Sequence, residues 1–180
     1  LTSKSHVKPL SAFYAAKEKA MKKMVVLFFL FATVFAQTLT EDRAHEIIDG
    51  IYKGDFREAF ATKNPDLFLK YIPDDFTSTL VDGQTFDATA LRQVFPTRFA
   101  NQVRLVEHNV TIEDVDVLSD DTISAIVTLY TLEEFSKPDG GTYFVTAIGT
   151  YRDDWQERDG QWYEIRGTQL RNQTITAPRP

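Results

Sequence analysis

The segment TYFVTAIGTYRDDWQERDGQWYEIRGTQL, residues 142–170, contains both tryptophans of the chain and places Asp159-Gly160 between two runs of alternating apolar and polar residues. Asp-Gly between such runs is a strong signal for a two-residue hairpin turn, because both central positions must adopt positive φ. A two-residue turn also fixes which residues face each other across the two strands. The predicted register places Trp155 opposite Glu164 and Asp153 opposite Arg166.

This register predicts what one face of the hairpin carries. The same face is expected to hold Tyr151, Trp155, Trp162 and Leu170, with the pair Asp153–Arg166 set among them. Such a surface is typical of the wall of a pocket with a polar floor. The alternative is a solvated sheet face, where cross-strand acid–base pairs are common.

The rest of the chain places helices before strands. Apolar residues at helical spacing predict a first helix from a capping box at Thr38 and Glu41 to Phe60. A short helix begins at Asn64-Pro65, a small hairpin surrounds Asp82-Gly83, and Asp87 caps a third helix that Pro96 bends or splits. Four long strands follow, at 103–117, 123–133, 142–157 and 161–174. This order predicts an α+β fold in which about three helices cover one face of an antiparallel sheet.

The N-terminal 36 residues resemble a leader. Lys22-Lys23 is followed by an apolar run from Val25 to Ala36, which has the anatomy of a secretory signal peptide with cleavage after Ala36. Residues 1–20 are expected to be a gene-start artefact or a long basic region of that signal. The predicted working unit is one domain at 37–175 with a flexible tail at 176–180, exported to a periplasmic or extracellular location.

Composition excludes several classes of partner. The chain has a net charge of −6, and loss of the lysine-rich leader would make it more acidic, which argues against nucleic acid. After cleavage the chain contains no basic amphipathic stretch, so binding to a membrane surface is not expected. Three dispersed histidines and no cysteine give no metal-ligand spacing, and no phosphate loop or dinucleotide fingerprint is present. We therefore expect no metal and no cofactor.

The segments YIPDDFTSTLVDGQTFDATAL (71–91), IEDVDVLSDDTISAIVTLYT (112–131) and GTYRDDWQERDGQWYEIRGTQL (149–170) resemble the SnoaL-like group of the nuclear transport factor 2-like superfamily. The resemblance covers about residues 40–172. It implies a cone-shaped domain, in which a curved sheet wraps around a helix and encloses a pocket, and it implies a homodimer for many members. Members include ketosteroid isomerase, dehydratases, cyclases, pure binders and assembly domains, so the fold does not define an activity.

Few residues of the isomerase carry over. Asp82 is the carboxylate nearest to the family's general base, but it precedes Gly83 in a turn that explains it without function. The first-helix tyrosine of the family falls nearest Phe56, which has no hydroxyl, and Tyr52 one turn earlier is the possible substitute. Asp153 matches the second oxyanion acid, which must be protonated. Arg166 opposite would instead keep Asp153 ionised.

The candidate catalytic residues are therefore Asp153, Arg166 and His108, each with a structural alternative. The alternative for Asp153 and Arg166 is a structural or solvated pair that needs no ligand, and the alternative for His108, on an apolar strand face, is a satisfied core histidine. Glu164 could act as a proton carrier only if it is buried, and we expect it to be exposed to solvent. The candidate ligand-binding residues are aromatic, and ordinary core packing is the alternative for each: Tyr52, Phe56, Phe95, Tyr130, Tyr151 and Trp155.

Three functions remain open. The leading hypothesis is a binding module with a pocket for a small, mostly apolar molecule. The second is a cofactor-free isomerase, dehydratase or cyclase that works by proton transfer. The third is a homodimeric interaction domain without turnover. A sealed, fully packed interior favours the third, and an open cavity with a buried, unpaired carboxylate or histidine favours the enzyme.

Overall fold

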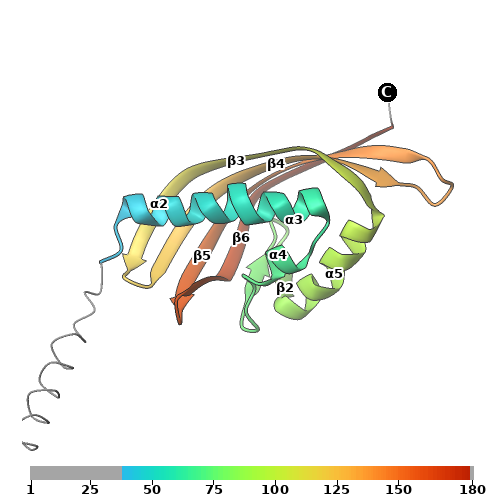
Figure 1. Ribbon diagram of the computed structural model, residues 1–180. Helices are drawn as coiled ribbons and strands as arrows, with labels where there is room; N and C mark the ends of the chain where they lie inside the picture. The colour runs from blue at the N-terminus through green and yellow to red at the C-terminus, as the bar shows by residue number, and fades with distance from the viewer. Residues whose placement is uncertain (1–37, 179–180) are drawn as a thin grey trace, which may run out of the picture. The chain divides into compact units, whose positions relative to one another are not determined.

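The computed structural model describes residues 38–178, so the predicted leader and cleavage site at 1–36 lie outside the described residues. Figure 1 shows the long strands β3–β6 arching over the helix that begins with α2, with α4, α5 and β2 on the same side of the sheet. In chain order the elements are α2 (Glu41–Asp49), η1 (Gly50–Phe56), α3 (Arg57–Thr62), α4 (Asp66–Leu69), β1 (Thr77–Thr79), β2 (Thr85–Asp87), α5 (Ala88–Asn101), β3 (Gln102–Ser119), β4 (Thr122–Ser136), β5 (Thr142–Arg158) and β6 (Gln161–Pro178). The predicted α+β class is confirmed.

The first helix is formed by α2, η1 and α3 in succession. Its cap is Thr40, whose hydroxyl accepts the Arg43 amide at 3.2 Å, so the predicted capping box at Thr38 is wrong by two residues. The middle segment η1 is a π-helical stretch, a wider helical turn that is frequent at functional sites. It holds the buried side chains of Tyr52 and Phe56. The π-helical turn therefore positions two of the predicted ligand-binding residues.

The two shorter helices begin where the sequence predicts. The Asn64 side chain accepts the Asp66 amide at 3.1 Å at the start of α4, and the Asp87 carboxylate accepts the Ala90 amide at 2.8 Å at the start of α5. Pro96 lies inside α5, which continues to Asn101, so the helix is not split. None of the helices in residues 38–178 is long and apolar enough to cross a membrane.

The sheet has six strands in the order β2-β1-β6-β5-β4-β3. Its long strands are antiparallel, but β1 pairs in parallel with β6, so the sheet is mixed. In that pairing Ser78 lies beside Gly167. The predicted flexible tail is wrong for residues 176–178, because they pair with Tyr143–Val145 on β5. The last two residues of that tail lie outside the described range.

The Asp159-Gly160 turn forms as predicted, with positive φ at both residues, and Trp155 does face Glu164. Beyond that pair, Ile165 is an extra residue on β6 and forms a β-bulge. Asp153 consequently lies opposite Gly167, and Arg166 lies opposite Asp154. The predicted Asp153–Arg166 pair is wrong for this reason. The same bulge places Tyr151 opposite Gln169, and a second bulge at Leu170 places Gly149 opposite Asn172.

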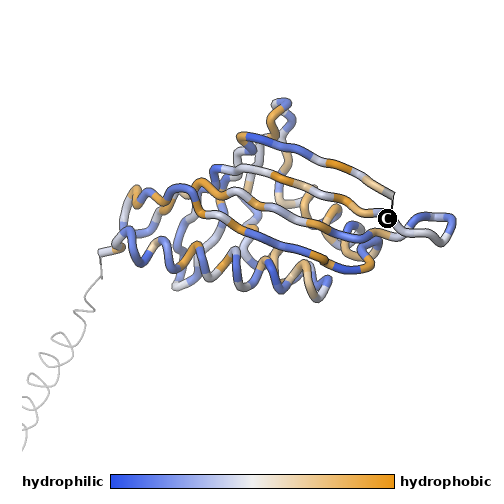
Figure 2. Tube along the Cα trace, turned by 90° about the horizontal axis from the view of Figure 1, so that it is seen from above, coloured by the Kyte–Doolittle hydropathy of each residue, from blue (hydrophilic) through white to orange (hydrophobic). Residues whose placement is uncertain are grey.

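The main core lies between the first helix and the concave face of the sheet. Figure 2 shows apolar and polar residues interspersed along the long strands, as expected when alternate side chains point to opposite faces. Fully buried Ile123, Ala125 and Val127 of β4 alternate in this way and pack against Ile48 of α2. Trp155 is fully buried in the same cluster. The Trp155 ring therefore packs against the first helix.

Candidate functional site

A cavity of about 280 Å³ lies between the concave face of the sheet, the first helix and the segment from α4 to α5. Its walls are mostly apolar and aromatic, whereas its polar groups come chiefly from β5 and β6. The lining residues are Tyr52, Phe56, Phe60, Phe68, Phe76, Ser78, Leu80, Phe86, Leu91, Phe95, Arg98, Leu129, Thr131, Ala147, Gly149, Tyr151, Asp153, Glu164, Gly167, Gln169 and Asn172.

Gly167 marks the polar floor of this cavity. A Cβ atom at this position would lie 3.0 Å from Oε1 of Glu164, 3.2 Å from Oγ of Ser78 and 3.3 Å from Oδ1 of Asp153. Three polar side chains from three different strands therefore converge on one point. The absence of a side chain at Gly167 leaves the room in which they meet.

Asp153 is held by a tyrosine from the first helix. Its side chain is buried, with 4% of the residue exposed, and its Oδ2 accepts the hydroxyl hydrogen bond of Tyr52. Burial raises the pKa of Asp153 to about 7, although the Tyr52 hydrogen bond favours the ionised form and the Asp154 charge disfavours it. Burial and the Asp153 charge together raise the pKa of Tyr52 well above its usual value. Tyr52 therefore acts as a donor and keeps its proton.

Glu164 is the second buried carboxyl group, with 7% of the residue exposed. Within the described residues it has no side-chain hydrogen bond and no ion pair. Burial, and then the charge of Asp153, raise its pKa well above the usual value. The expectation that Glu164 is exposed to solvent is wrong. The Tyr71 carbonyl accepts the Glu164 amide at 2.9 Å, so the chain segment after α4 lies over the hairpin at this point.

Tyr151 and Gln169 form a neutral polar group beside the carboxyl groups. The Gln169 amide donates to the Tyr151 hydroxyl at 3.1 Å, and burial raises the pKa of Tyr151. The ring of Tyr151 lies against Gly149, where a Cβ would come within 2.5 Å of its Cε2 and hydroxyl oxygen. Glycine at 149 is thus required for this orientation of Tyr151.

Arg98 is the basic side chain in the cavity lining. It forms an ion pair with Glu133, which is completely buried on β4. The guanidinium carbon also lies 5.6 Å from the centre of the Phe60 ring and 5.7 Å from that of Phe135. Its charge is therefore already matched by Glu133.

The structure brings five of the predicted site residues to the cavity and leaves four outside its lining. Asp153, Tyr52, Phe56, Phe95 and Tyr151 line it. Trp155 belongs to the core beneath. Thr131 lines the cavity, so the adjacent Tyr130 points to the opposite face of the sheet.

Arg166 lies outside the cavity as well. Its side chain is 66% exposed and lies 3.8 Å from the carboxylate of Asp154, on the opposite face from Asp153. The bulge at Ile165 is the physical reason, since it places Gly167 where Arg166 was expected. Asp153 consequently has no basic partner across the strand.

His108 packs against the Phe60 ring at 5.7 Å between ring centres and does not line the cavity. Neither of its ring nitrogens has a hydrogen-bond partner in the described part of the chain. Burial lowers its pKa, and the Arg57 charge adds to the effect. His108 is therefore a neutral residue packed against the core. Its ring nitrogens lack the hydrogen-bond partners that a satisfied core histidine would have.

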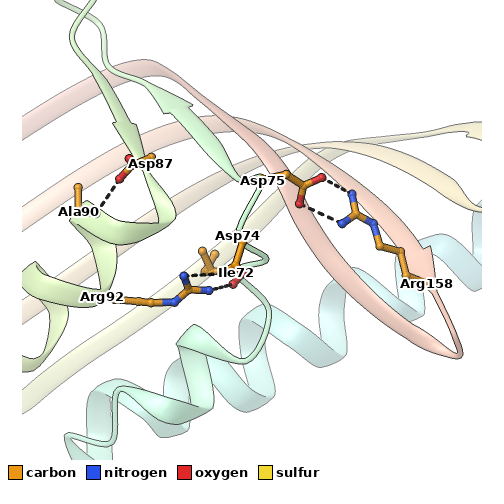
Figure 3. Close-up of polar contacts among 7 residues, drawn as sticks. All are labelled: Ile72, Asp74, Asp75, Asp87, Ala90, Arg92 and Arg158. Atoms are coloured by element: carbon orange, nitrogen blue, oxygen red, sulfur yellow. Dashed lines mark hydrogen bonds and ion pairs between the residues drawn. The ribbon is translucent and has the colours of Figure 1, made fainter.

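Two arginines anchor residues 72–75, the loop that leads to the cavity residues Phe76 and Ser78, as Figure 3 shows. Arg158, next to the hairpin turn, holds Asp75 with two hydrogen bonds of 2.9 Å and 2.8 Å. Arg92 of α5 donates to the Asp74 carboxylate at 2.7 Å and to the Ile72 carbonyl at 2.9 Å. These contacts fix the loop that precedes Phe76 and Ser78.

Sequence reasoning missed Ser78, Gly167 and Gln169. Ser78 belongs to a short hairpin whose parallel pairing with β6 has no local signal in the sequence. Gly167 and Gln169 reach the floor only because of the bulge. The chain carries no group of three or more potential metal ligands within residues 38–178.

The fold and this cavity define a member of the nuclear transport factor 2-like superfamily. The family model of the SnoaL-like domain matches residues 42–166, and the chain belongs to that family.

Similar solved structures include a scytalone dehydratase-like protein from Novosphingobium aromaticivorans, with a TM-score of 0.60 and 16% identity over 78% of this chain and 92% of that one. The hexachlorocyclohexane dehydrochlorinase LinA-type3 from Novosphingobium barchaimii has a TM-score of 0.52 and 14% identity over 73% and 89%. A nuclear transport factor 2-like protein from Cytophaga hutchinsonii gives 0.51 and 17% over 69% and 95%. At these identities the likeness shows the fold alone. No curated protein matches the chain.

Proposed function

We propose that this domain binds a small, mostly apolar molecule in the cavity and transfers a proton on it with Asp153 as the base. The observation that carries the proposal is a pair of buried carboxyl groups on the floor of an aromatic cavity, of which Glu164 has no side-chain partner within residues 38–178. Enzymes use such burial to bring a carboxyl group near the pH at which it works.

The two carboxyl groups differ in a way that suggests their roles. Tyr52 donates to Asp153 and so favours its ionised form, whereas the Glu164 carboxyl group has no donor among the described residues. Two carboxyl groups this close do not both ionise readily. Glu164 therefore keeps the proton while Asp153 carries the charge near neutral pH. In an apolar cavity that charge is poorly solvated, which makes Asp153 a stronger base than an exposed aspartate.

The names of two similar solved structures agree with this reaction class. Two are named as a dehydrochlorinase and a scytalone dehydratase-like protein, and both names denote eliminations. An elimination or isomerisation begins when a base removes a proton from carbon, which is the role proposed for Asp153. The particular substrate is not given by these likenesses, because their identities are low.

The test uses 5-nitrobenzisoxazole, a flat and mostly apolar probe. When a base takes its carbon-bound proton, the electron pair forms a nitrile, the ring N–O bond breaks and a coloured phenolate leaves. We expect turnover above the buffer rate, with a pH profile that rises through about 7. Asp153→Asn should lower it by roughly 100-fold or more. Asp116→Asn, an exposed residue of β3 outside the cavity lining, is the control and should leave turnover unchanged.

A binding module without turnover is the alternative. It is favoured by the aromatic wall itself, in which Phe68 and Phe95 stack at 4.2 Å and Phe56 lies 4.6 Å from Phe68. Such rings bind a flat apolar molecule without any proton transfer. Binding of the probe without turnover above the buffer rate would favour this function over catalysis.

Export and self-association are further parts of the proposal. The sequence of residues 22–36 supports export. A homodimer is supported by the face of the sheet opposite the helices, where Tyr130 and Ile148 are cross-strand neighbours and no helix of the described chain lies over them. Light scattering at micromolar concentration should give twice the mass of one chain, and a single-chain mass at every concentration would contradict the dimer.

A further inference from the structure

The charges around the cavity are unequal. Asp153 and Glu164 line it, and Arg98 is the basic residue of the described lining. The positive charge of Arg98 is taken up by Glu133, which is buried behind it. The floor therefore has acidic groups and no cation of its own.

Glu164 is the group that this imbalance affects most. Its neighbours on the floor are the carboxyl group of Asp153, the hydroxyl of Ser78 and, on adjacent elements, Tyr52 and Tyr151. None of them is positively charged. Asp153 has Tyr52 as a donor, but Glu164 is more than nine-tenths buried and has no hydrogen bond or ion pair within the described residues. A buried carboxyl group of this kind is costly to ionise unless a cation is brought to it.

The walls favour the same kind of ligand. Phe56, Phe68 and Phe76 line the cavity from η1, α4 and the loop before β1. The face of an aromatic ring carries partial negative charge and attracts ammonium groups, and this attraction is strongest where water is excluded. Aromatic rings together with a free carboxyl group thus form both halves of a site for an organic cation.

From these observations we infer that the cavity selects a small apolar amine, with its ammonium group against the Glu164 carboxylate and its apolar part between the phenylalanine rings. This inference rests on the proposed function, since it names the substrate class of the same cavity. Glu164 holds the ammonium group in place, and Asp153 beside it reaches a proton on the neighbouring part of the molecule. Glu164 gives up its own proton when the amine binds.

The test compares benzylamine with benzyl alcohol, which has nearly the same shape but no charge at pH 7.5. Isothermal titration of the full chain should show benzylamine binding tighter by about tenfold or more. Titrations in two buffers of different ionisation enthalpy should show that amine binding releases close to one proton. Glu164→Gln should reduce amine affinity to that of the alcohol and remove the proton release.

Benzyl alcohol also serves as the control for folding, because Glu164→Gln should still bind it. Equal affinities for the two probes, tighter binding of the alcohol, or no binding of the amine would overturn the inference. An amine preference that persists in Glu164→Gln would also overturn it. Turnover of 5-nitrobenzisoxazole is measured separately, so the proposed function can stand when the amine preference fails, and the reverse.

Discussion

The hydroxyl of Tyr52, on the first helix, donates a hydrogen bond to Asp153 on β5, across 101 positions of the chain. Tyr52 and Asp153 are both buried, and Phe56 lies 4.9 Å from the Tyr52 ring. This contact ties the helix to the floor of the cavity. It also makes the charge of Asp153 depend on a residue from a distant segment.

Tyr52→Phe should therefore destabilise the domain and alter Asp153. We expect a loss of roughly 1–3 kcal/mol in the free energy of unfolding, because a buried acceptor loses its donor. The pKa of Asp153 should rise above about 7, since the hydrogen bond favours the ionised form. Urea unfolding and the pH profile of probe turnover measure the two effects. Tyr71→Phe is the control: its hydroxyl bonds Asp55 at 2.5 Å in a half-exposed position, where water can replace it.

Stability should fall as the pH rises from about 4 to about 7. In this window the folded state keeps a proton on Asp153, whose pKa is raised from 3.8 to about 7, and the unfolded state has released it. Because the folded state binds more protons, each rise in pH favours unfolding, by a few kcal/mol in all as an order of magnitude. The pKa of Glu164 is raised in the same direction, so Glu164 adds to the decline. Asp153→Asn should flatten the part below pH 7, and an unchanged slope would show that Asp153 titrates normally.

Arg166→Ala should cost less than about 1 kcal/mol, because the Arg166 side chain is 66% exposed and lies 3.8 Å from the partly buried Asp154 carboxylate. A double-mutant cycle between Asp153 and Arg166, measured by denaturant unfolding, should give a coupling near zero. A strong coupling between these two residues would mean that the strands pair without the bulge at Ile165.

Gly167→Ala should damage the site more than the fold. The added methyl group would stand about 3 Å from the oxygens of Glu164, Ser78 and Asp153, which must then move apart. We expect probe turnover to fall by about tenfold, because proton transfer depends on where the carboxyl group is held. The matched control is Gly54→Ala, where a Cβ meets nothing within 4 Å in a helical segment. That change should preserve turnover and stabilise the domain by roughly 0.5–1 kcal/mol.

Processing of the N-terminus is the last prediction. N-terminal sequencing of protein collected outside the cell or from the periplasm should begin at Gln37 or within a residue or two, because small residues such as Ala36 are preferred at the cleavage site. A membrane-bound product that retains Val25–Phe35 would contradict it.

Much of this fold can be predicted from local sequence, because the signals are local. The Asp159-Gly160 turn, the Asp87 cap and the order of helices and strands each depend on a few adjacent residues. The site is different. A β-bulge such as Ile165 has no clear signal in its own sequence, yet it exchanges Arg166 for Gly167 opposite Asp153. One extra residue thus removes the counter-ion that the sequence suggested for Asp153. The hydrogen bond from Tyr52 takes its place.

Glu164 illustrates the second limit. Its position near the end of the hairpin suggests exposure, but the chain after α4 lies against the hairpin, where the Tyr71 carbonyl accepts the Glu164 amide. Burial by a segment some 90 positions earlier cannot be inferred from alternation along one strand. Tyr52 and Tyr151, by contrast, are found by pattern alone, because the periodicity of a helix or strand determines the face on which they lie.

The parallel pairing of Ser78 with Gly167 has a consequence for how the protein is made. The cavity floor combines residues from the first helix, the short hairpin and the last strand, so it does not exist until β6 has joined the sheet. Because synthesis begins at the N-terminus, the segments that form the helices are made well before the last residues of the site. Until that final strand is added, Asp153 lacks Glu164 and Gly167, its neighbours on the floor. Chemical reactivity at this site therefore requires the complete sheet.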